Sequence, residues 1–397
     1  MQADHVIIER ELVSCAMGMI PQLRERAAMT ETLRHLLPET ECDFRNAGFY
    51  RVLQPKYYGG LELPYGAHTQ LAIELARGCA SSAWAYSVTA CHSWILGMFP
   101  REAQDEIWHT NPDATIASTF LPAQMSAIPV DHGEAGGLKL SGRWRFSSNV
   151  EYCQACIVIV MLSQENTPPK QFFALLHRDQ YRIEDTWNVV GLAGSGSNDV
   201  IVEDVYVPAH RLLNVMTTRT ASTPGAQAHE GDLFHTPLFC AFAHSLVGVA
   251  VGAAQGALDL LLDELTDKTS VGQVKLAQQP SVQMRLAEAT AEIEAAKALL
   301  KVDREKILEG AEQRHLPDDT QRTLYRLNTG YAAKLSVQAV ERLLPLTGGR
   351  GLEKLHPFQR QWRDVHAVAQ HIALVWDVQA LNYGSVRLGS KAMDPRI

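Results

Sequence analysis

The sequence predicts an α+β protein in which a block of short strands lies between two blocks of helices. Near both ends of the chain, apolar residues recur three and four positions apart, which is typical of helices packed on one face. Between residues 114 and 207 the apolar runs become short, rich in β-branched and aromatic residues, and separated by Gly, Pro and Ser. No helical pattern interrupts these runs, so we expect an antiparallel sheet or barrel.

The first block, residues 1–113, is predicted to be a helical domain. A turn rich in Pro, Tyr and Gly at 55–60 interrupts it. The third predicted helix is rich in Ala and Ser, which allow close packing. The expected helices are 20–37, 44–52, 67–97 and 102–108.

The middle block, residues 114–220, is predicted to be a β domain. Its strands are expected at 114–120, 137–146, 155–162, 171–177 and 199–207. Cys153 and Cys156 form a CxxC pair where a strand begins, with no second pair or His cluster nearby. We therefore expect buried strand cysteines and predict no metal site.

The last block, residues 221–397, is helical again. Thr236-Pro237 is a good N-cap and first-turn pair for a helix that runs to Asp259. Residues 239–258 are apolar enough to suggest a membrane span, but the polar residues within them and many Ala and Gly favour a buried core helix. Further helices are predicted over 286–300, 322–343 and 362–388, with Gly348-Gly349 breaking the pattern.

Composition limits the partners. The chain has 397 residues, 46% hydrophobic and 20% charged, with a formal net charge of −8. This balance disfavours nucleic acid and anionic membrane surfaces as general partners. Seven scattered cysteines, and an N-terminus without the features of a signal peptide, lead us to expect a cytoplasmic setting.

The stretch 142–149 is the first candidate site. The rings of Trp144 and Phe146 could cover one face of a planar heteroaromatic group, and the hydroxyl of Ser147 or Ser148 could reach a nitrogen at its edge. The alternative is an ordinary β-corner with a buried tryptophan.

Five motifs occur together in order: residues 55–60, 142–149, 194–208, 348–349 and 363–364. In that order they resemble the acyl-CoA dehydrogenase superfamily over essentially the whole chain. The resemblance implies an N-terminal helical domain, a central antiparallel β-barrel, a C-terminal four-helix bundle and a homotetramer built as a dimer of dimers. It also places Ser148 beside the flavin N5 atom, with Trp144, Phe146 and Ser147 around the ring.

The sequence departs from the dehydrogenases at two places. They carry a catalytic carboxylate shortly after the Arg-Asp pair, where this chain has His371-Ile372-Ala373. Where they grip the FAD pyrophosphate with Arg and Phe-Gly, this chain has Lys268 and Gly272. Without a base to remove the α-proton of a thioester, dehydrogenation is lost.

These departures resemble the flavin-dependent monooxygenase branch, the two-component aromatic hydroxylases. The resemblance implies diffusible reduced FMN or FAD from a separate NAD(P)H:flavin reductase, O2 as co-substrate, and a flavin C4a-hydroperoxide that hydroxylates a small aromatic molecule. Ser81-Ser82-Ala83-Trp84 leading to His92 also fits that branch.

Site residues follow from the same comparison. His371, His92 and Ser148 are the catalytic candidates, and His92, Ser118 and His371 are expected to contact substrate. Lys268, Gly348 and Gly349 are expected to contact the flavin. Each histidine could instead be a core residue, and Ser118 a plain strand hydroxyl.

No arginine stands beside His92 or His371 in the sequence, which favours a neutral phenol, indole or polyketide ring. Two other functions stay open. One is an acyl-CoA dehydrogenase with a displaced carboxylate, and the other is a flavin-binding protein without catalysis.

Overall fold

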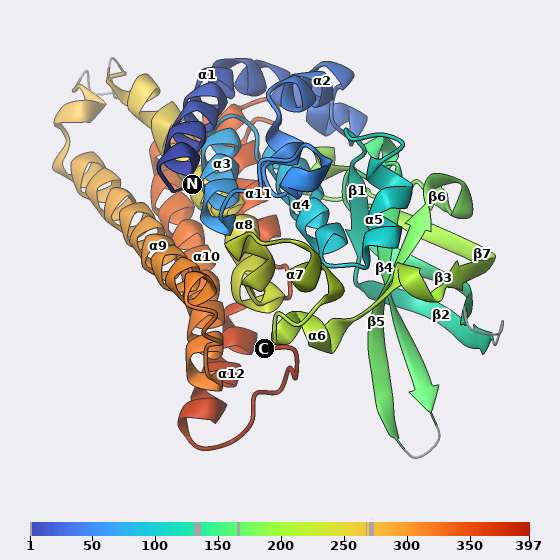
Figure 1. Cartoon of the computed structure of the whole chain (residues 1–397). Helices are drawn as coiled ribbons and strands as arrows, with labels where there is room; N and C mark the ends of the chain where they lie inside the picture. Colours follow the sequence, from blue (N-terminus) through green and yellow to red (C-terminus); the bar gives the residue numbers. More distant parts are fainter. Residues whose placement is uncertain (1, 131–135, 165–166, 267, 270–273) are drawn as a thin grey trace.

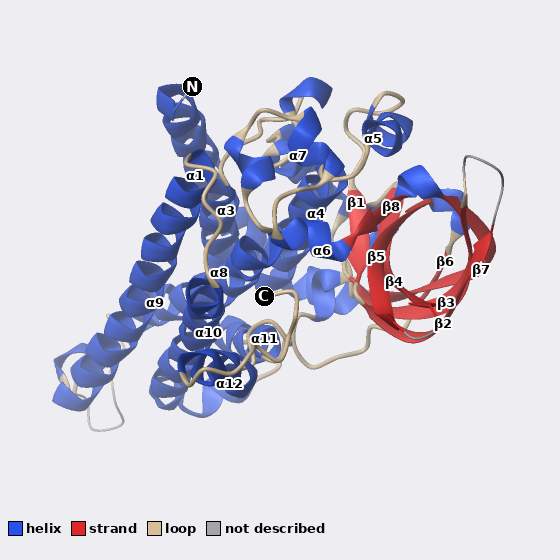
Figure 2. Ribbon diagram, turned by 60° about the horizontal axis from the view of Figure 1, so that its bottom comes forward, coloured by secondary structure: helices blue, strands red, loops and turns tan. Residues whose placement is uncertain are grey.

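The computed structural model describes residues 2–130, 136–164, 167–266, 268–269 and 274–397. Strands gather on one side of the molecule and helices on the other (Figure 2). Along the chain, the strands fall between two helical blocks (Figure 1). The predicted order of helices, strands and helices is confirmed, while the boundaries at residues 113 and 220 stay predictions.

The N-terminal helices differ from prediction at three places. The expected helix 44–52 is the end of α2 followed by a short 3-10 helix over Phe49–Arg51, and Gly48, with φ +74°, separates the two. Helix α1 begins near the start of the chain and includes Pro21, and the expected helix 67–97 is two helices separated by an extended residue, Cys79 (φ −153°, ψ 112°). Gly78 ends the first of the two against α1, where an added Cβ would meet the Leu23 side chain at 2.6 Å. The helices are α1 (Gln2–Leu33), α2 (Pro38–Asn46), α3 (Tyr65–Gly78), α4 (Ala80–Gly97) and α5 (Arg101–Trp108).

The strands form two four-stranded sheets that pack against each other, with orders β1-β4-β5-β8 and β2-β3-β7-β6. Among the described residues no strand pairing joins the sheets into the closed barrel that was expected, and β1 pairs with β4 in parallel. The sequence reading missed three strands, β2, β6 and β8. The strands are β1 (Ile116–Thr119), β2 (Leu121–Val130), β3 (Gly137–Ser147), β4 (Ala155–Gln164), β5 (Thr167–His177), β6 (Arg182–Glu184), β7 (Asn198–Pro208) and β8 (Leu212–Asn214).

Trp144 fills the space between the two sheets. Its side chain is fully buried, and its indole Nε1 donates a hydrogen bond to the Ile159 carbonyl on β4 at 2.8 Å. The hydrogen bond therefore ties one sheet to the other. This is the β-corner alternative, in which the tryptophan is a core residue.

The C-terminal helices pack around α8, which contacts α3, α4, α9, α10 and α11. Helix α8 is long and apolar enough to cross a membrane, but 78% of its most apolar window is buried inside the protein. Thr236 does not cap it, because the Thr236 hydroxyl donates to the Asp232 carbonyl and Pro237 is the N-cap residue. The helices are α6 (Val215–Arg219), α7 (Pro224–Ala228), α8 (Leu238–Leu265), α9 (Pro280–Glu312), α10 (Asp319–Thr347), α11 (Pro357–Ala369) and α12 (Trp376–Arg387).

The α3–α8 contact depends on Gly252. A Cβ atom at this position would lie 2.1 Å from the Ile73 carbonyl oxygen and 2.8 Å from the Ala76 Cβ. We expect Gly252→Ala to lower the free energy of unfolding by about 1–3 kcal/mol through overpacking. The matched control is Gly18→Ala, in helix α1 with open space around its Cα, which should raise it by up to about 1 kcal/mol. Urea denaturation followed by circular dichroism checks both, and equal midpoints for the two variants would contradict the packing argument.

Candidate functional site

The site is arranged along one face of helix α4. Trp84 and His92 lie eight residues apart on this helix, which is about two turns or ~12 Å along its axis. Every residue of α4 is buried. Two clusters of polar side chains meet the helix, one at each of these two residues.

The first cluster is a chain of hydrogen bonds around Trp84. The indole Nε1 of Trp84 donates to the Ser148 Oγ at 3.0 Å, and the Ser148 Oγ lies 2.7 Å from the Ser197 Oγ. The Ser197 Oγ lies 2.8 Å from the Ser195 Oγ. Since an indole nitrogen only donates, the Ser148 oxygen accepts from Trp84 and its own proton stays available to another acceptor.

His371 also packs against Trp84, with ring centroids 5.7 Å apart. The sequence interpretation placed His371 inside a helix, which is wrong: α11 ends at Ala369, α12 begins at Trp376, and His371 lies in the turn between them. In that turn the Ala373 backbone N–H donates to the His371 Nδ1 at 3.2 Å.

His371 is neutral at neutral pH. Burial, and next the charge of Arg326, lowers the pKa of His371 to about 4. Because Nδ1 accepts from a backbone N–H, the single ring proton lies on Nε2. His371 therefore presents an N–H donor.

The second cluster joins His92 to Ser118. The His92 Nδ1 donates to the Ile116 carbonyl at 3.0 Å, and the Ser118 Oγ lies 2.6 Å from the His92 Nε2. Burial lowers the pKa of His92 to about 4, so the ring is neutral and its Nε2 accepts the Ser118 proton. The Ser118 oxygen is left with lone pairs able to accept a proton from a ligand hydroxyl.

The residues predicted to contact the flavin ring differ in how far they are exposed. Phe146 is 50% exposed, has φ +68°, and packs at 5.7 Å on Trp187. Trp144 and Ser147 are fully buried, and the Ser147 Oγ faces the Cys156 Sγ. Neither side chain reaches a surface, and their contact with a ligand stays a prediction.

The remaining candidates lie apart from both clusters. Lys268 is half-buried after α8, with its Nζ 3.9 Å from a Glu264 carboxylate oxygen. Gly348 and Gly349 are exposed at the end of α10. Within the described part of the chain, none of the three makes a hydrogen bond or ion pair with either cluster. Gly272 lies outside the described residues.

Arg326 corrects the expectation that no arginine lies near His371. It belongs to α10, about 45 residues before His371 in the sequence, and its charge reaches His371 through space. Sequence proximity could not reveal this, because the neighbourhood is made by helix packing.

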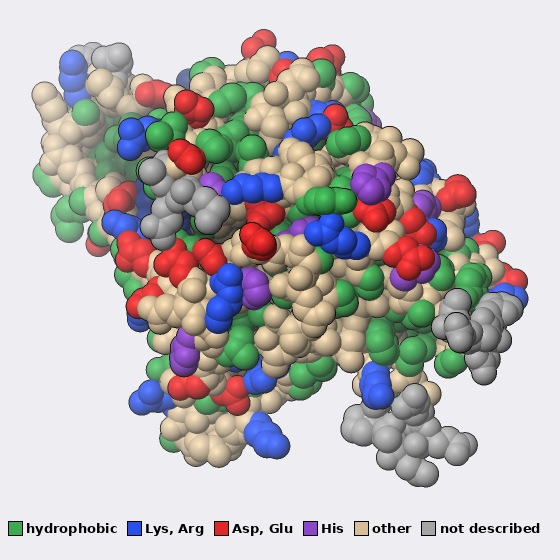
Figure 3. All heavy atoms as spheres, in the orientation of Figure 1, with side chains coloured by type: hydrophobic (Ala, Val, Ile, Leu, Met, Phe, Trp, Pro, Cys, Tyr) green, Lys and Arg blue, Asp and Glu red, His purple; other side chains and the backbone are tan. Residues whose placement is uncertain are grey.

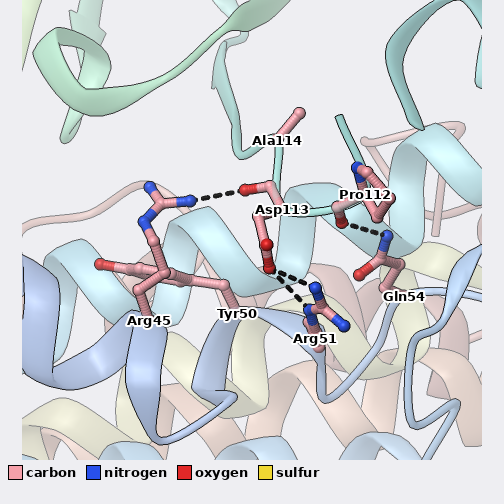
Figure 4. Close-up of a pocket in the computed structure, with 7 residues that line it drawn as sticks. All are labelled: Arg45, Tyr50, Arg51, Gln54, Pro112, Asp113 and Ala114. Carbon is pink, nitrogen blue, oxygen red and sulfur yellow. Dashed lines mark hydrogen bonds and ion pairs between the residues drawn. The ribbon is translucent and has the colours of Figure 1, made fainter. Parts of the chain in front are cut away.

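Three cavities lie elsewhere. The one in Figure 4 has a volume of about 10 Å³, room for a single water molecule, and its polar groups are already paired, as in the hydrogen bond from Gln54 to the Pro112 carbonyl. A larger cavity, of about 520 Å³, is lined mainly by α3, α8 and α9. Another, of about 530 Å³, is lined mainly by α8, α9 and α10. None of the three is lined by a residue of the two clusters.

The turn 370–375 contains no carboxylate. Asp364, on the preceding helix, is buried and has a pKa raised by burial to about 7, which would suit a base. Its Oδ1, however, accepts the Leu192 backbone N–H at 2.6 Å, so it holds the loop before β7. No described contact directs it toward Trp84 or Ser148.

Comparison with known proteins agrees with this geometry. Models of the acyl-CoA dehydrogenase N-terminal domain and of the acyl-CoA dehydrogenase C-terminal domain match residues 14–111 and 244–376. The chain is 35% identical over 393 residues to the oxygenase component of FADH(2)-dependent resorcinol hydroxylase from Rhizobium sp. (strain MTP-10005), covering 95% of this chain and 94% of that one. The chain belongs to the flavin-dependent monooxygenase branch of the acyl-CoA dehydrogenase family.

Two more members of this branch are similar over nearly the whole chain. The oxygenase component of p-hydroxyphenylacetate 3-hydroxylase from Acinetobacter baumannii is 29% identical, covering 94% of this chain and 87% of that one. The crystal structure of 3-HSA hydroxylase from Rhodococcus sp. RHA1 superposes with a TM-score of 0.92 at 28% identity, covering 98% and 99% of the two chains. The family assignment favours a monooxygenase over the two alternatives, a flavin-binding protein without catalysis and an acyl-CoA dehydrogenase with a displaced carboxylate.

The residues present fit a flavin. The half-exposed Phe146 ring offers a flat apolar surface, and the Ser148 hydroxyl lies two residues further along the chain. The Asn149 Oδ1 is buried without a hydrogen-bond partner among the described residues, while its Nδ2 donates to the Thr89 hydroxyl of α4. An unpartnered buried acceptor beside a hydroxyl suits the N–H groups at the edge of a flavin ring.

The depressed histidine pKa values predict a pH effect. Unfolded histidines take up a proton near pH 6.5, whereas His92 and His371 do so near 4 in the folded protein. The unfolded state therefore binds more protons between these values, so stability falls as the pH is lowered from about 6.5 to 4. His92→Asn should make that fall shallower in urea titrations at a series of pH values. Parallel curves for the variant and the natural protein would contradict the pKa assignment.

Proposed function

We propose that this protein is the oxygenase component of a two-component system that hydroxylates a small phenolic substrate. The observation that carries the proposal is the buried Ser118–His92 pair, on the same face of α4 as the Trp84–Ser148–His371 cluster. Relatives named as resorcinol and p-hydroxyphenylacetate hydroxylases support a phenol over an indole or polyketide ring.

The substrate hydroxyl donates to the Ser118 oxygen, while the Ser118 proton is directed at the His92 Nε2. The Ile116 carbonyl holds the opposite edge of the His92 ring and fixes its tautomer. The pair polarises the phenol O–H and raises electron density on the ring carbons that react. General-base assistance of this kind contributes about 10²–10⁴-fold.

Reduced flavin, when bound, supplies two electrons and activates O2. Phe146 and Ser148 would hold its ring, with the buried Asn149 amide at the edge. Trp84 orients the Ser148 oxygen by donating to it, and Ser197 orients its proton. His371, whose ring packs against Trp84, offers its Nε2–H as a further donor.

The partners follow from this role. A separate NAD(P)H:flavin reductase delivers the reduced flavin, as "oxygenase component" in the relatives' names supports. Lys268 in place of an arginine supports a flavin that exchanges, so the protein should purify largely without it. Gly348 and Gly349, exposed at the end of α10, would contact flavin held in part by a neighbouring subunit of a homotetramer.

The proposal also covers the location of the protein and the partners that it lacks. A cytoplasmic protein without a membrane or nucleic-acid partner is supported by seven free cysteines and a net charge of −8. Acidic and basic side chains are interspersed on the face shown in Figure 3, and no broad basic surface covers it.

The direct test mixes purified protein with externally reduced FMN or FAD, O2 and a phenol under single-turnover conditions. Hydroxylated product in a yield approaching one per flavin oxidised is expected. Oxidation of an acyl-CoA without oxygen incorporation would instead establish the dehydrogenase alternative.

Ser148 and His371 should be separable by how flavin oxidation is coupled to hydroxylation. Ser148→Ala should still bind reduced flavin and consume O2 but release more hydrogen peroxide per flavin, because the hydroxyl no longer controls the proton at the flavin edge. His371→Ala should lower product formation by about 10²-fold, because it removes a buried hydrogen-bond donor from the site. The two effects are measured as hydrogen peroxide and hydroxylated product formed per flavin oxidised. If both variants couple flavin oxidation to hydroxylation as well as the natural protein does, the site is misplaced.

The Ser118–His92 pair predicts a different signature. Ser118→Ala and His92→Gln should each lower the rate of product formation by about 10²-fold while leaving the affinity for reduced flavin unchanged. Their effects should not add in the double variant, because the two side chains act as one unit. Additive losses in a double-mutant cycle would show that they act separately.

A further inference from the structure

The segment 190–197, which we call the loop 190–197, lies just before β7 and contacts the corner that bears Ser148. The Ser197 Oγ, at the end of the loop, lies 2.7 Å from the Ser148 Oγ. The Asn149 backbone N–H donates to the Ser195 carbonyl at 2.9 Å. Two hydrogen bonds, one between side chains and one between backbone groups, therefore fix the corner to this loop.

Helix α11 holds the other end of the loop. The Asp364 Oδ1 accepts the Leu192 backbone N–H at 2.6 Å, and the Arg363 guanidinium donates to the Val190 carbonyl. A Cβ atom on Gly191 would lie 2.4 Å from the Arg363 carbonyl oxygen, so a glycine is needed for the backbone to approach the helix this closely. The loop is therefore clamped between α11 at one end and the Ser148 corner at the other.

The loop is compact, which makes its two ends move together. Leu192 adopts φ +54°, a left-handed conformation that is costly for a leucine and persists only where surrounding contacts fix it. Its N–H is held by Asp364, and its carbonyl accepts the Ser195 N–H at 3.0 Å. Gly194 packs on α1, where an added Cβ would meet the Thr30 Cγ2 at 2.5 Å. A shift of Leu192 would therefore displace the serines that follow it.

The Asp364 carboxyl is 3% exposed, and burial raises its pKa to about 7. The charged groups that face it are Arg363 and Arg360 on its own helix and Glu31 on α1. Both arginines pair with the Glu31 carboxylate, at 2.6 and 2.7 Å, so their charges are largely offset. The Cys79 thiol is also near, but burial raises its pKa and keeps it protonated. Asp364 thus changes charge close to neutral pH.

We propose that Asp364 is a positioning residue for the Ser148 hydroxyl, acting through the loop 190–197 and not on any bound molecule. A carboxylate holds an N–H donor about twice as strongly as a neutral oxygen does. When Asp364 takes up a proton, its hold on Leu192 weakens and Ser197 is no longer fixed beside Ser148. This inference rests on the proposed function, in which Ser148 lies at the flavin edge.

The first measurement needs neither flavin nor substrate. Amide hydrogen exchange of flavin-free protein, corrected for the intrinsic effect of pH, gives the protection of the Leu192 and Asn149 amides at pH 6 and pH 8. The charged fraction of a group with a pKa near 7 rises about tenfold over this range. Protection of both amides should therefore be about 5–10-fold greater at pH 8. Asp364→Asn keeps an oxygen acceptor of the same shape but does not titrate, so protection should be low and equal at both pH values.

A matched control tests whether any change around α11 has the same effect. The Glu341 carboxylate accepts from the Trp362 Nε1 and contacts the His366 Nε2, each at 2.8 Å, on the more exposed side of this helix. Glu341→Gln should leave the pH dependence of protection unchanged. The proposal is overturned if protection in the natural protein does not depend on pH, if Asp364→Asn keeps that dependence, or if Glu341→Gln loses it.

The second measurement follows the effect to Ser148. With reduced flavin and O2, hydrogen peroxide released per flavin should be low at pH 8 and rise at pH 6 toward the value of Ser148→Ala. Ser197→Ala interrupts the path at its other end, so it should remove this pH dependence while the Leu192 amide keeps its own. Ser197→Thr, which retains the hydroxyl, should restore it. Peroxide release that keeps its pH dependence in Ser197→Ala would show that Asp364 does not act through the loop.

Failure of this inference and failure of the proposed function give different results. A protein that never hydroxylates a phenol would still show the exchange pattern, because that measurement contains no flavin. A protein that hydroxylates a phenol but shows no pH dependence in the Leu192 amide would retain the function and lose the role given to Asp364.

Discussion

Helix α4 is buried along its whole length, and both polar clusters of the site are built on it. Trp84 and Thr89 hold the corner that bears Ser148 and Asn149, and His92 holds β1 through the Ile116 carbonyl. These hydrogen bonds connect the helical part of the molecule to both sheets. A helix buried on all sides cannot turn about its axis without breaking them, so the distance between the two clusters is set by the helix itself.

The spacing of small residues explains how α4 can be enclosed. Its sequence carries Ala, Ser and Gly at many positions, which lets α3, α8 and β1 approach closely. The close approach of α8 to α3 has the same cause, since the Ile73 carbonyl occupies the place where Gly252 has no side chain. Tight packing of this kind transmits small shifts, which is how a change on one helix can misplace a catalytic side chain.

The sequence was informative where local pattern and chemistry coincide. The order of helices and strands, Ser148 at a strand end, and His92 and Ser118 as separate site candidates could be predicted. The hydrogen bond between His92 and Ser118 could not, because the packing of α4 on β1 brings them together. Trp84 received no site role from the sequence, although its spacing of eight from His92 puts both on one helix face. The helix break before His371 could not be foreseen, because residues 369–375 contain neither Gly nor Pro. The role of Arg326 could not be predicted for a different reason, because only the packing of α10 against the turn brings it near His371.

Trp144 shows why strand periodicity misled. In a regular strand, residues two apart share a face, so Trp144 and Phe146 were expected to cover the same side of a ligand. The register with β7 shifts between Trp144 and Ser147, and Phe146 adopts φ +68°, which turns its side chain outward. Because of this irregular register, Trp144 lies in the core while Phe146, two residues later, is exposed.

The turn that carries His371 distinguishes oxygen transfer from dehydrogenation in physical terms. A dehydrogenase needs a charged acceptor there, able to remove a proton from carbon. Here the Ala373 N–H occupies the Nδ1 of His371, and burial together with Arg326 keeps the ring neutral, so the turn offers a donor. A neutral N–H donor can hydrogen-bond to an oxygen atom of a bound group without attracting water, since an uncharged buried group needs little hydration.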